Sequence, residues 1–280
     1  MELVIGDGLI GRHLYWFIRR LPGVNVGGRF ANLGYTSRRG GIRLDLAEGE
    51  WELPVCRVAY ICIGETSTER CEEDPSGTRL VNVTNTIKLA SQLRKSDSFV
   101  VFISSERVFN GLESFRGVGD GVCPTTEYGR QKAEVEEGLL LLGCTVVRFA
   151  KVLGLRMPLF EDWAEDLRKG VLIHPYSNVS MAPLPVSFVV DALKTIGDRR
   201  IGGLLQVSGL YDISYDRIAY HIANYIGADM RLVQPVESDK PHPHTTLKDN
   251  FAMANGKDIP GSWRTIYNWC YDRKHFLEGT

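Results

Sequence analysis

The sequence predicts an α/β fold in which a doubly wound parallel sheet carries helices on both faces, followed by a smaller C-terminal α+β domain. The first observation is a short apolar run that leads into closely spaced glycines at the start of the chain. The second is a series of continuous apolar runs, typical of buried parallel strands: Val58–Ile63, Phe99–Ile103 and Thr145–Phe149. The third is the loss of this pattern after Gly154, where prolines interrupt the chain repeatedly.

The glycines Gly6, Gly8 and Gly11 have the spacing Gly-x-Gly-x-x-Gly and open an amphipathic helix expected over Leu9–Arg20. In this arrangement the first glycine permits a tight turn, the second lets the backbone approach a pyrophosphate, and the third lets the helix pack closely on the strand. The helix start, at Leu9, Ile10 and Gly11, presents free N–H groups and a partial positive charge to phosphates. The stretch therefore predicts a dinucleotide site, and an ordinary tight turn is the alternative.

Composition excludes several other classes of protein. The chain has 280 residues, with 33 Lys and Arg against 34 Asp and Glu, so no global field attracts nucleic acid or a membrane surface. No apolar run approaches the roughly 18–20 residues that a membrane span needs, and the start of the chain reads as a strand rather than a signal peptide. The six cysteines form no Cys-x-x-Cys pair, which favours reduced thiols and a cytoplasmic location.

The residues after the expected second strand bear on the choice of cofactor. In NAD-preferring sites an Asp or Glu about 20 residues past the glycines binds the adenosine ribose. This chain instead has Ser37, Arg38 and Arg39 after Thr36. Guanidinium groups suit a 2′-phosphate because they offer it a bidentate fork. The segment favours NADP, with NAD possible, and a solvated basic loop is the alternative.

Two later segments are expected to border the same cofactor. Asp45, beside Leu46, could end a strand and accept the adenine amino group, although a surface Asp is almost as plausible. The strand over Val58–Ile63 ends at Ile63 and Gly64, at the sheet edge where cofactors lie. The polar loop that follows contains Thr66, and a helix then runs to about Lys95. Asn82 on this helix is expected to brace the backbone of the site.

A catalytic group is predicted from three residues. Ser104 and Ser105 come directly after the apolar run Phe99–Ile103, and Tyr128 and Lys132 lie one turn apart at the start of a helix. Tyr128 would be the general acid in carbonyl reduction, with a pKa lowered by the positive charge of Lys132 and of the nicotinamide. Ser105 would hydrogen-bond the substrate oxygen. Tyr-x-x-x-Lys alone is a weak signal, but a strand-end Ser followed by Tyr-x-x-x-Lys, both after the glycine motif, is a specific combination.

On these residues the chain resembles the extended short-chain dehydrogenase/reductases, and among them the dTDP-4-dehydrorhamnose reductase and related nucleotide-sugar reductase family. The segments that carry the resemblance are Gly6–Gly11, Cys71–Pro75, Val81–Val83, Ile103–Gly111 and Pro124–Lys132, with looser matches at Val147-Arg148 and Pro241–Lys248. The resemblance implies a Rossmann domain over residues 1–154, to which residues 184–208 return. It also implies a nucleotide-sugar domain over residues 155–183 and 209–280.

The resemblance further implies that Ser105, Tyr128 and Lys132 form the catalytic triad and that Tyr128 and Lys132 contact the cofactor. Substrate contacts are expected from these side chains: Thr66, Ser105, Glu106, Phe109, Asn110, Lys151 and Lys248. Two positions depart from the family. Arg107 replaces an aromatic residue and also argues against the related 4,6-dehydratases, and Lys151 stands where a Trp near the sugar is usual.

The second half is expected to contain helices over Trp163–Lys169, Val186–Ile196 and Tyr215–Ile226 and a strand over Leu204–Val207. His242 and His244 alternate with prolines and lack a third ligand, so no metal site is expected. The predicted function is reduction of a 4-keto group on a nucleotide-activated deoxysugar. Two alternatives stay open: a nucleotide-sugar epimerase that retains its cofactor, and a non-catalytic regulatory subunit of the same fold. A homodimer is possible.

Overall fold

The computed structural model of the chain describes residues 1–26, 33–36 and 41–273. Its described residues divide into two compact units. Unit 1 takes Met1–Phe109, Val118–Phe149 and Val186–Gln206. Unit 2 takes Asn110–Gly117, Ala150–Pro185 and the described residues from Val207 onward.

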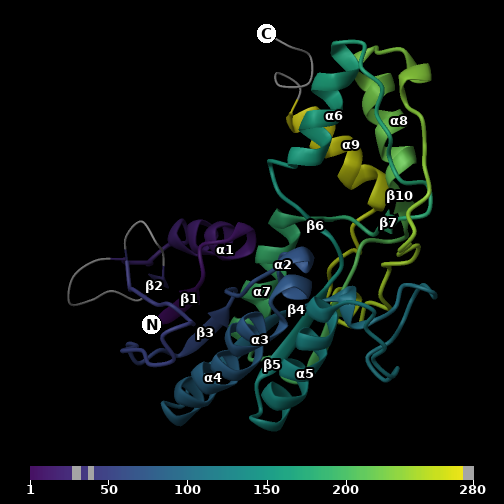
Figure 1. Cartoon of the computed structure of the whole chain (residues 1–280). Helices are drawn as coiled ribbons and strands as arrows, with labels where there is room; N and C mark the ends of the chain where they lie inside the picture. The colour runs from purple at the N-terminus through teal and green to yellow at the C-terminus, as the bar shows by residue number, and fades with distance from the viewer. Residues whose placement is uncertain (27–32, 37–40, 274–280) are drawn as a thin grey trace. The chain divides into compact units, whose positions relative to one another are not determined.

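Unit 1 is built on a six-stranded sheet with the order β2-β1-β3-β4-β5-β9 (Figure 1). The strands, in that order, are Leu33–Thr36, Glu2–Ile5, Val58–Ile61, Phe99–Ser105, Thr145–Phe149 and Leu204–Val207. The pairs from β2 to β5 are parallel; Leu3 of β1, for example, lies opposite Gly34 of β2 and Ala59 of β3. Because parallel strands end together, the residues that follow β1, β3 and β4 are brought to one edge of the sheet.

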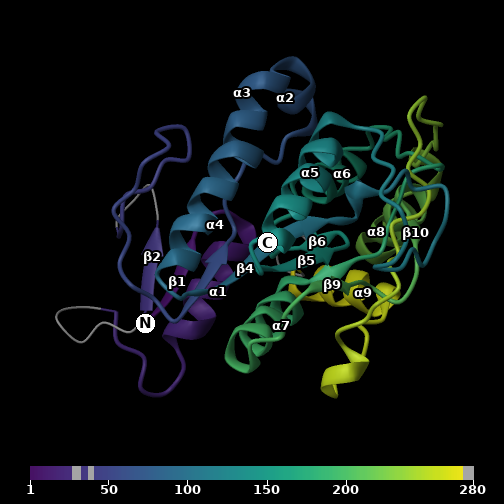
Figure 2. The same cartoon turned by 90° about the horizontal axis from the view of Figure 1, so that it is seen from below.

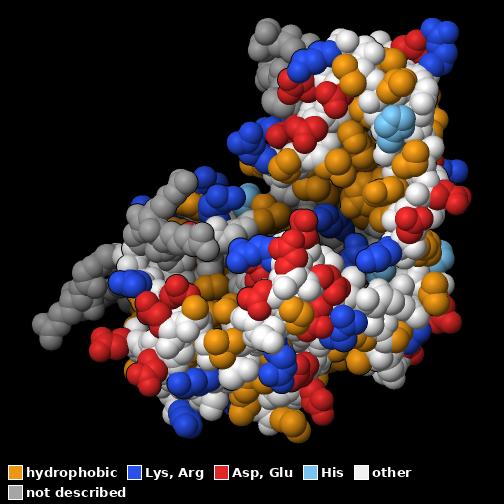
Figure 3. All heavy atoms as spheres, in the orientation of Figure 1, with side chains coloured by type: hydrophobic (Ala, Val, Ile, Leu, Met, Phe, Trp, Pro, Cys, Tyr) orange, Lys and Arg blue, Asp and Glu red, His pale blue; other side chains and the backbone are white. Residues whose placement is uncertain are grey.

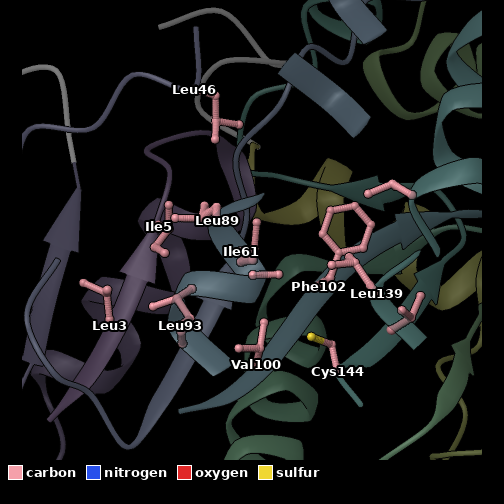
Figure 4. Close-up of a cluster of buried hydrophobic side chains, with 14 of the residues drawn as sticks. Leu3, Ile5, Leu46, Ile61, Leu89, Leu93, Val100, Phe102, Leu139 and Cys144 are labelled. Atoms are coloured by element: carbon pink, nitrogen blue, oxygen red, sulfur yellow. The ribbon is translucent and has the colours of Figure 1, made fainter. Parts of the chain in front are cut away.

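Helices cover both faces of this sheet (Figure 2). One face carries α4, Thr86–Lys95, and α5, Glu127–Leu141, while the other carries α1, Leu9–Arg19, and α7, Val186–Arg199. At the first face, strand residues such as Leu3, Ile61 and Phe102 meet Leu93 of α4 and Leu139 of α5 (Figure 4). The strands are apolar on both sides because both sides are buried. The predicted doubly wound α/β fold is confirmed.

Three shorter elements precede α4. They are α2, Thr68–Glu73, α3, Pro75–Arg79, and a π-helical segment, Leu80–Asn85. The side chain of Asp74 caps α3 by accepting the N–H of Gly77, and Pro75 occupies its first position, where the missing N–H costs nothing. A π-helical segment often marks a functional position within a helix, and here it contains Asn82.

Unit 2 has a small core between three helices. These are α6, Pro158–Arg168, α8, Tyr215–Ile226, and α9, Ser262–Asp272. Phe160, Trp163 and Trp269 pack together in this core. Two short strand pairs complete it: β6, Val152–Leu153, with β8, Leu184–Pro185, and β7, Ser180–Met181, with β10, Ile213–Ser214.

Most helices lie where the sequence predicts them. Helix α8 has the expected bounds, while α6 begins earlier than expected because Pro158 starts it rather than breaks it. Helix α9 was not predicted.

On the face of unit 1 in Figure 3, acidic and basic side chains lie side by side without a broad field of one sign. No helix in the described part of the chain combines the length and hydropathy needed to cross a bilayer.

Candidate active site

The glycine turn after β1 depends on two close approaches of backbone. Gly6 has φ 110°, in the region that favours glycine, and a Cβ there would lie 2.8 Å from the backbone of Cys62. A Cβ on Gly11 would lie 2.0 Å from the carbonyl oxygen of Gly6. The N–H of Gly6 donates to Oγ1 of Thr36 at 2.8 Å, which links the turn to the end of β2. The turn is therefore held tightly against its neighbours.

The middle glycine has a different environment. Gly8 is the N-cap of α1, and a Cβ placed on it would meet nothing within 4 Å. The first turn of α1 contains no acidic residue, and no side chain in the described ranges caps its N–H groups. The start of α1 at Leu9, Ile10 and Gly11 therefore has no side-chain cap in the described ranges, and it presents the positive end of the helix dipole next to the open surroundings of Gly8. This arrangement fits the phosphates of a dinucleotide.

The residues expected to choose between NADP and NAD cannot be placed. Ser37, Arg38 and Arg39 lie outside the described residues. Asp45 does not end a strand; it lies in the connection between β2 and β3, where its Oδ1 accepts the N–H of Ala47 at 2.9 Å. The expectation of a strand-end carboxylate is wrong, because this segment forms a turn. Leu46 is buried, and its carbonyl accepts a hydrogen bond from Asn85.

The loop after β3 is braced by Asn82, as expected. Oδ1 of Asn82 accepts the N–H of Glu65 at 2.8 Å, and its Nδ2 donates to the carbonyl of Glu65 and to Oε1 of Gln131 at 3.0 and 2.8 Å. Gln131 in turn donates to Oγ1 of Thr78 at 2.9 Å. This buried chain of amides positions Gly64 and its neighbours, Ile63 and Thr66, at the edge of the sheet. Gln131 was missed by sequence reasoning, although it lies inside the Tyr-x-x-x-Lys segment.

The three predicted catalytic residues come together within unit 1. Ser105 is the last residue of β4, while Tyr128 and Lys132 occupy the first turns of α5, which Thr126 caps by accepting the N–H of Gly129. Nζ of Lys132 donates to the carbonyl oxygen of Ile103 at 3.0 Å and lies 5.7 Å from the centre of the Tyr128 ring. Lys132 is 8% exposed. The strand end and the helix start thus present a hydroxyl, a phenol and an amine together.

Burial moves the two titrating groups in opposite directions. It raises the pKa of Tyr128, an effect that the charge of Glu106 reinforces and that a hydrogen bond with Ser105 opposes. Burial lowers the pKa of Lys132 to about 8, although the charge of Glu136 opposes this. In this structure the pKa of Tyr128 is not lowered by the protein's own charges as expected, because burial exceeds the nearby positive charge, and the lowering by a bound nicotinamide stays a prediction. A phenol that keeps its proton at neutral pH can act as a general acid.

Two charged residues follow Ser105 directly. Oγ of Ser105 donates to Oε2 of Glu106 at 2.9 Å and accepts the N–H of Arg107 at 3.2 Å. Nε of Arg107 lies 3.4 Å from the Glu106 carboxylate, whose side chain is 8% exposed. The charge of Arg107 partly opposes the rise in the pKa of Tyr128, so the guanidinium lies close enough to affect this phenol. Phe109 is 3% exposed, so its ring is packed inside the protein and is not available at the surface of the site.

A buried ion pair behind the triad was not predicted. Glu136 of α5 and Arg148 of β5 are each 3% exposed and are joined by Nη2 to Oε2 at 2.7 Å and by Nε to both carboxylate oxygens at 3.0 and 3.1 Å. The sequence holds a signal for such a pair, since Arg148 interrupts an apolar strand and a buried Arg needs a partner. The partner could not be identified without the fold.

The remaining substrate candidates belong to unit 2. Lys151 and Lys248 are exposed, and Oδ1 of Asn110 accepts the N–H of Leu112 at 3.0 Å. The loop that carries Lys248 is anchored by Asp212, whose Oδ1 accepts the N–H groups of Thr245 and Thr246 at 2.6 and 2.9 Å. Sequence reasoning missed Asp212 as the anchor. Within the described ranges, no group of three or more His, Cys, Asp or Glu side chains gathers as a metal site would require.

The parallel sheet, the glycine turn and the Ser–Tyr–Lys group together define a Rossmann-type protein of the short-chain dehydrogenase/reductase class. Within that class, the chain belongs to the RmlD substrate binding domain family, whose profile matches residues 55–265. A search of curated protein sequences finds no match to the chain.

Solved structures resemble the whole chain. A dTDP-4-dehydrorhamnose reductase from Clostridium acetobutylicum ATCC 824 has a TM-score of 0.81 at 18% identity, covering 98% of this chain and 100% of that chain. The dTDP-4-dehydrorhamnose reductase from Bacillus anthracis strain Ames, in complex with NADP, has a TM-score of 0.79 at 16% identity and covers 97% of both chains. MoeE5 in complex with UDP-glucose and NAD has a TM-score of 0.76 at 19% identity, covering 96% and 98%. These likenesses establish the fold.

Proposed function

We propose that this protein is an NADPH-dependent reductase of a 4-keto group on a nucleotide-activated deoxysugar. The observation that carries the proposal is the group formed by Ser105, Tyr128 and Lys132, in which the phenol holds a proton beside a buried amine. Family membership and the activity named for the reductases from Clostridium and Bacillus support it. The intact triad favours a reductase over a regulatory subunit, because a regulator has no chemical need for all three groups.

Each residue has a distinct part in this proposal. When bound, the dinucleotide supplies the hydride that reduces the carbonyl carbon. Ser105 donates a hydrogen bond to the substrate oxygen and fixes its position. Tyr128 donates its proton to the same oxygen as negative charge develops there. The ammonium group of Lys132 stabilises the phenolate that remains. Lys132 and Tyr128 also contact the cofactor.

The cofactor lies at the carboxyl edge of the sheet in this proposal. Gly8 leaves room for the pyrophosphate, and the free N–H groups at the start of α1 bind it. The loop at Gly64, which Asn82 braces, would help to hold the bound dinucleotide. Arg38 and Arg39 bind the 2′-phosphate and make NADP the preferred cofactor. NAD is the alternative, and it is the dinucleotide named for the MoeE5 complex.

Unit 2 is the nucleotide-sugar domain in this proposal. Lys151 and Lys248 are exposed cations that suit the diphosphate or the sugar hydroxyls, and Asp212 holds the loop of Lys248 in one conformation. Within unit 1, Thr66, Glu106 and Arg107 are proposed to contact the sugar. Arg107 is a departure from the aromatic residue usual in the family, so we expect it to affect which sugar is accepted.

The proposal is tested by cofactor and substrate titration. Purified protein is titrated with NADPH and separately with NADH while nicotinamide fluorescence is followed, and dTDP-4-keto-6-deoxyglucose is then added while absorbance of the reduced cofactor is recorded. Steady stoichiometric loss of absorbance is the expected result. Tight binding without loss contradicts reduction of this sugar and favours an epimerase or a regulatory subunit. Failure to bind either cofactor contradicts the proposed dinucleotide site.

A further inference from the structure

The buried pair of Glu136 and Arg148 lies on the same side of α5 as the catalytic residues. Tyr128, Lys132 and Glu136 are spaced by four residues, so their side chains follow one another along one face of the helix. Lys132 is 8% exposed and Glu136 is 3% exposed. The carboxylate is therefore the next ionisable group behind the catalytic amine, in an environment where little water screens its charge.

Glu136 also connects α5 to the end of β4. Its carboxylate accepts the hydroxyl of Ser104 as well as three hydrogen bonds from Arg148. Ser104 is the residue before Ser105, and Lys132 itself donates to the carbonyl of Ile103. Two successive turns of α5 thus hold two successive residues at the strand end, Ile103 and Ser104, and so constrain where the next residue, Ser105, lies relative to Tyr128.

Arg148 extends the network away from the site. Its Nη1 donates to Oε1 of Gln206 on β9 at 3.1 Å, and its guanidinium lies 5.1 Å from the centre of the Phe109 ring. Arg148 therefore contacts the segment after Ser105 from behind.

Other groups also face the amine of Lys132. Cys62 follows β3 and Cys71 lies on α2, and both thiols influence Lys132 as Glu136 does. Burial raises the pKa of both thiols, so at neutral pH they are uncharged. Glu106 and Arg107 act on Tyr128. Among the groups that influence the amine in the described structure, Glu136 is therefore the carboxylate whose charge opposes the effect of burial on Lys132.

We propose that Glu136 and Arg148 are positioning residues for the proposed reduction. Arg148 pairs with the Glu136 carboxylate, and Glu136 sets its negative charge behind the Lys132 amine while it holds α5 against the end of β4. An apolar pair of similar volume could pack equally well. The charge would then serve the catalytic lysine rather than the stability of the fold. The inference rests on the proposed function only for its effect on turnover.

The first experiment measures Lys132 without any substrate. Protein labelled with ¹³C at the lysine ε carbon is titrated by NMR, and the Lys132 signal is assigned by its loss in Lys132→Met. Glu136→Gln should lower the midpoint of this signal by about one pH unit, because a negative charge is lost and Arg148 is left unpaired. Adding Arg148→Met should recover part of that shift, since the unpaired positive charge is then removed.

A matched control lies on the same helix. Glu134 of α5 forms an exposed ion pair with Arg79, and its side chain is 43% exposed. Glu134→Gln makes the same chemical change on α5 and should leave the Lys132 midpoint unchanged, because solvent screens this pair. If Glu136 had a purely structural role, the Lys132 midpoint would stay unchanged in both folded Glu136→Gln and the folded double variant with Arg148→Met. That result would overturn the inference.

The second experiment follows kcat and KM against pH. In Glu136→Gln the fall in kcat on the alkaline side should begin at lower pH than in the wild type, with KM for the nucleotide sugar changed little. If Glu136→Gln does not fold, the double variant is compared directly with the wild type. Its Lys132 midpoint should still be lower, because the negative charge of Glu136 is missing from this variant as well. An unchanged midpoint in the folded double variant contradicts the inference.

The two experiments separate the inference from the proposed function. If the Lys132 midpoint is lower in the variants but the wild-type protein reduces no sugar, the proposed reductase function is refuted, while the effect of Glu136 on Lys132 stands. If the wild-type protein reduces the sugar but the Lys132 midpoint is unchanged in both variants, the effect of Glu136 on Lys132 is refuted, while the reductase function stands.

Discussion

Tyr128 and Lys132 meet opposite demands within one helical turn. In the proposed reduction the phenol keeps its proton until the carbonyl oxygen develops charge, and burial favours this by raising the pKa of Tyr128. The proposal also requires the amine to stay charged despite burial, and its pKa of about 8 leaves it mostly protonated at neutral pH. The proposed mechanism therefore predicts that the pair suits reduction near neutrality and becomes less suited to it as pH rises.

Tyr128→Phe should lower kcat at least about 100-fold, because the proton donor is removed while the ring and its packing remain. Cofactor affinity, measured by nicotinamide fluorescence, should change little. Tyr271→Phe is the control, since Tyr271 is 61% exposed and should leave turnover unchanged. Near-normal turnover in Tyr128→Phe would exclude this residue as the acid.

The rate of reduction should fall as pH rises through about 8. The sign follows from the charge: a lysine with its pKa lowered to about 8 loses its proton above that pH, and with it the positive charge that stabilises the phenolate. Tyr128 itself keeps its proton to higher pH because its pKa is raised. A plot of log kcat against pH measures this. A rate that stays constant to about pH 10 would contradict the role of Lys132.

Arg38→Ala should weaken NADPH binding about ten-fold and leave NADH binding nearly unchanged, because only NADPH carries the 2′-phosphate that a guanidinium would bind. Arg43→Ala is a suitable comparison, since the Arg43 side chain is 88% exposed and pairs with Glu48. Fluorescence titrations with both cofactors give the ratio. Equal losses for NADPH and NADH would refute the 2′-phosphate contact.

At the scale of single elements, the turn between β1 and α1 separates folding from binding. Gly6 and Gly11 are required by backbone contacts within the protein, whereas Gly8 borders open space. Within one motif, Gly6 and Gly11 are therefore needed for folding, whereas Gly8 is expected to be needed for binding. This distinction is invisible in the spacing alone and can be tested with one substitution at each kind of position.

Gly11→Ala should destabilise the protein by about 1–3 kcal/mol, because the new methyl would overlap the carbonyl oxygen of Gly6. Gly8→Ala should leave the melting temperature nearly unchanged, since its φ of −66° and open surroundings accept a methyl group. It should nevertheless weaken cofactor binding by blocking the approach of the pyrophosphate. Unaltered affinity in Gly8→Ala would argue against a phosphate at this helix start.

At the scale of the whole molecule, each unit has buried side chains of its own within the described residues. One buried cluster of unit 1 lies between the sheet and helices α4 and α5, and a cluster of unit 2 lies between α6, α8 and α9. The proposed cofactor residues belong to unit 1, and several proposed sugar contacts belong to unit 2. Damage to one core should therefore affect one ligand more than the other.

Phe160→Ala should cost about 3–5 kcal/mol, because a fully buried ring is lost from the core of unit 2. Binding of the nucleotide sugar should weaken more than binding of NADPH. Leu93→Ala, in the core of unit 1, should show the reverse order, with a cost of about 2–5 kcal/mol. Calorimetry and ligand titrations measure both effects. Equal loss of both ligands in each variant would mean that the cores do not fail separately.

The strands and catalytic spacing could be predicted because their signals are local. A continuous apolar run such as Phe99–Ile103 is buried on both faces in any parallel sheet, and four residues always bring Tyr128 and Lys132 to one side of a helix. The glycines at the start of the chain were equally readable. Asp45 was misread because a turn can follow an apolar residue as readily as a strand can end there.

What the sequence by itself determined is therefore the α/β class, the glycine turn and the order of the catalytic residues along the chain. Only the tertiary structure decided that Glu136 pairs with Arg148, that Gln131 holds Asn82, and that Asp212 anchors the loop near Lys248. The physical reason is distance along the chain. Periodicity reports which side of an element is buried, but a buried polar group finds its partner on another element, and that choice depends on how the strands are ordered.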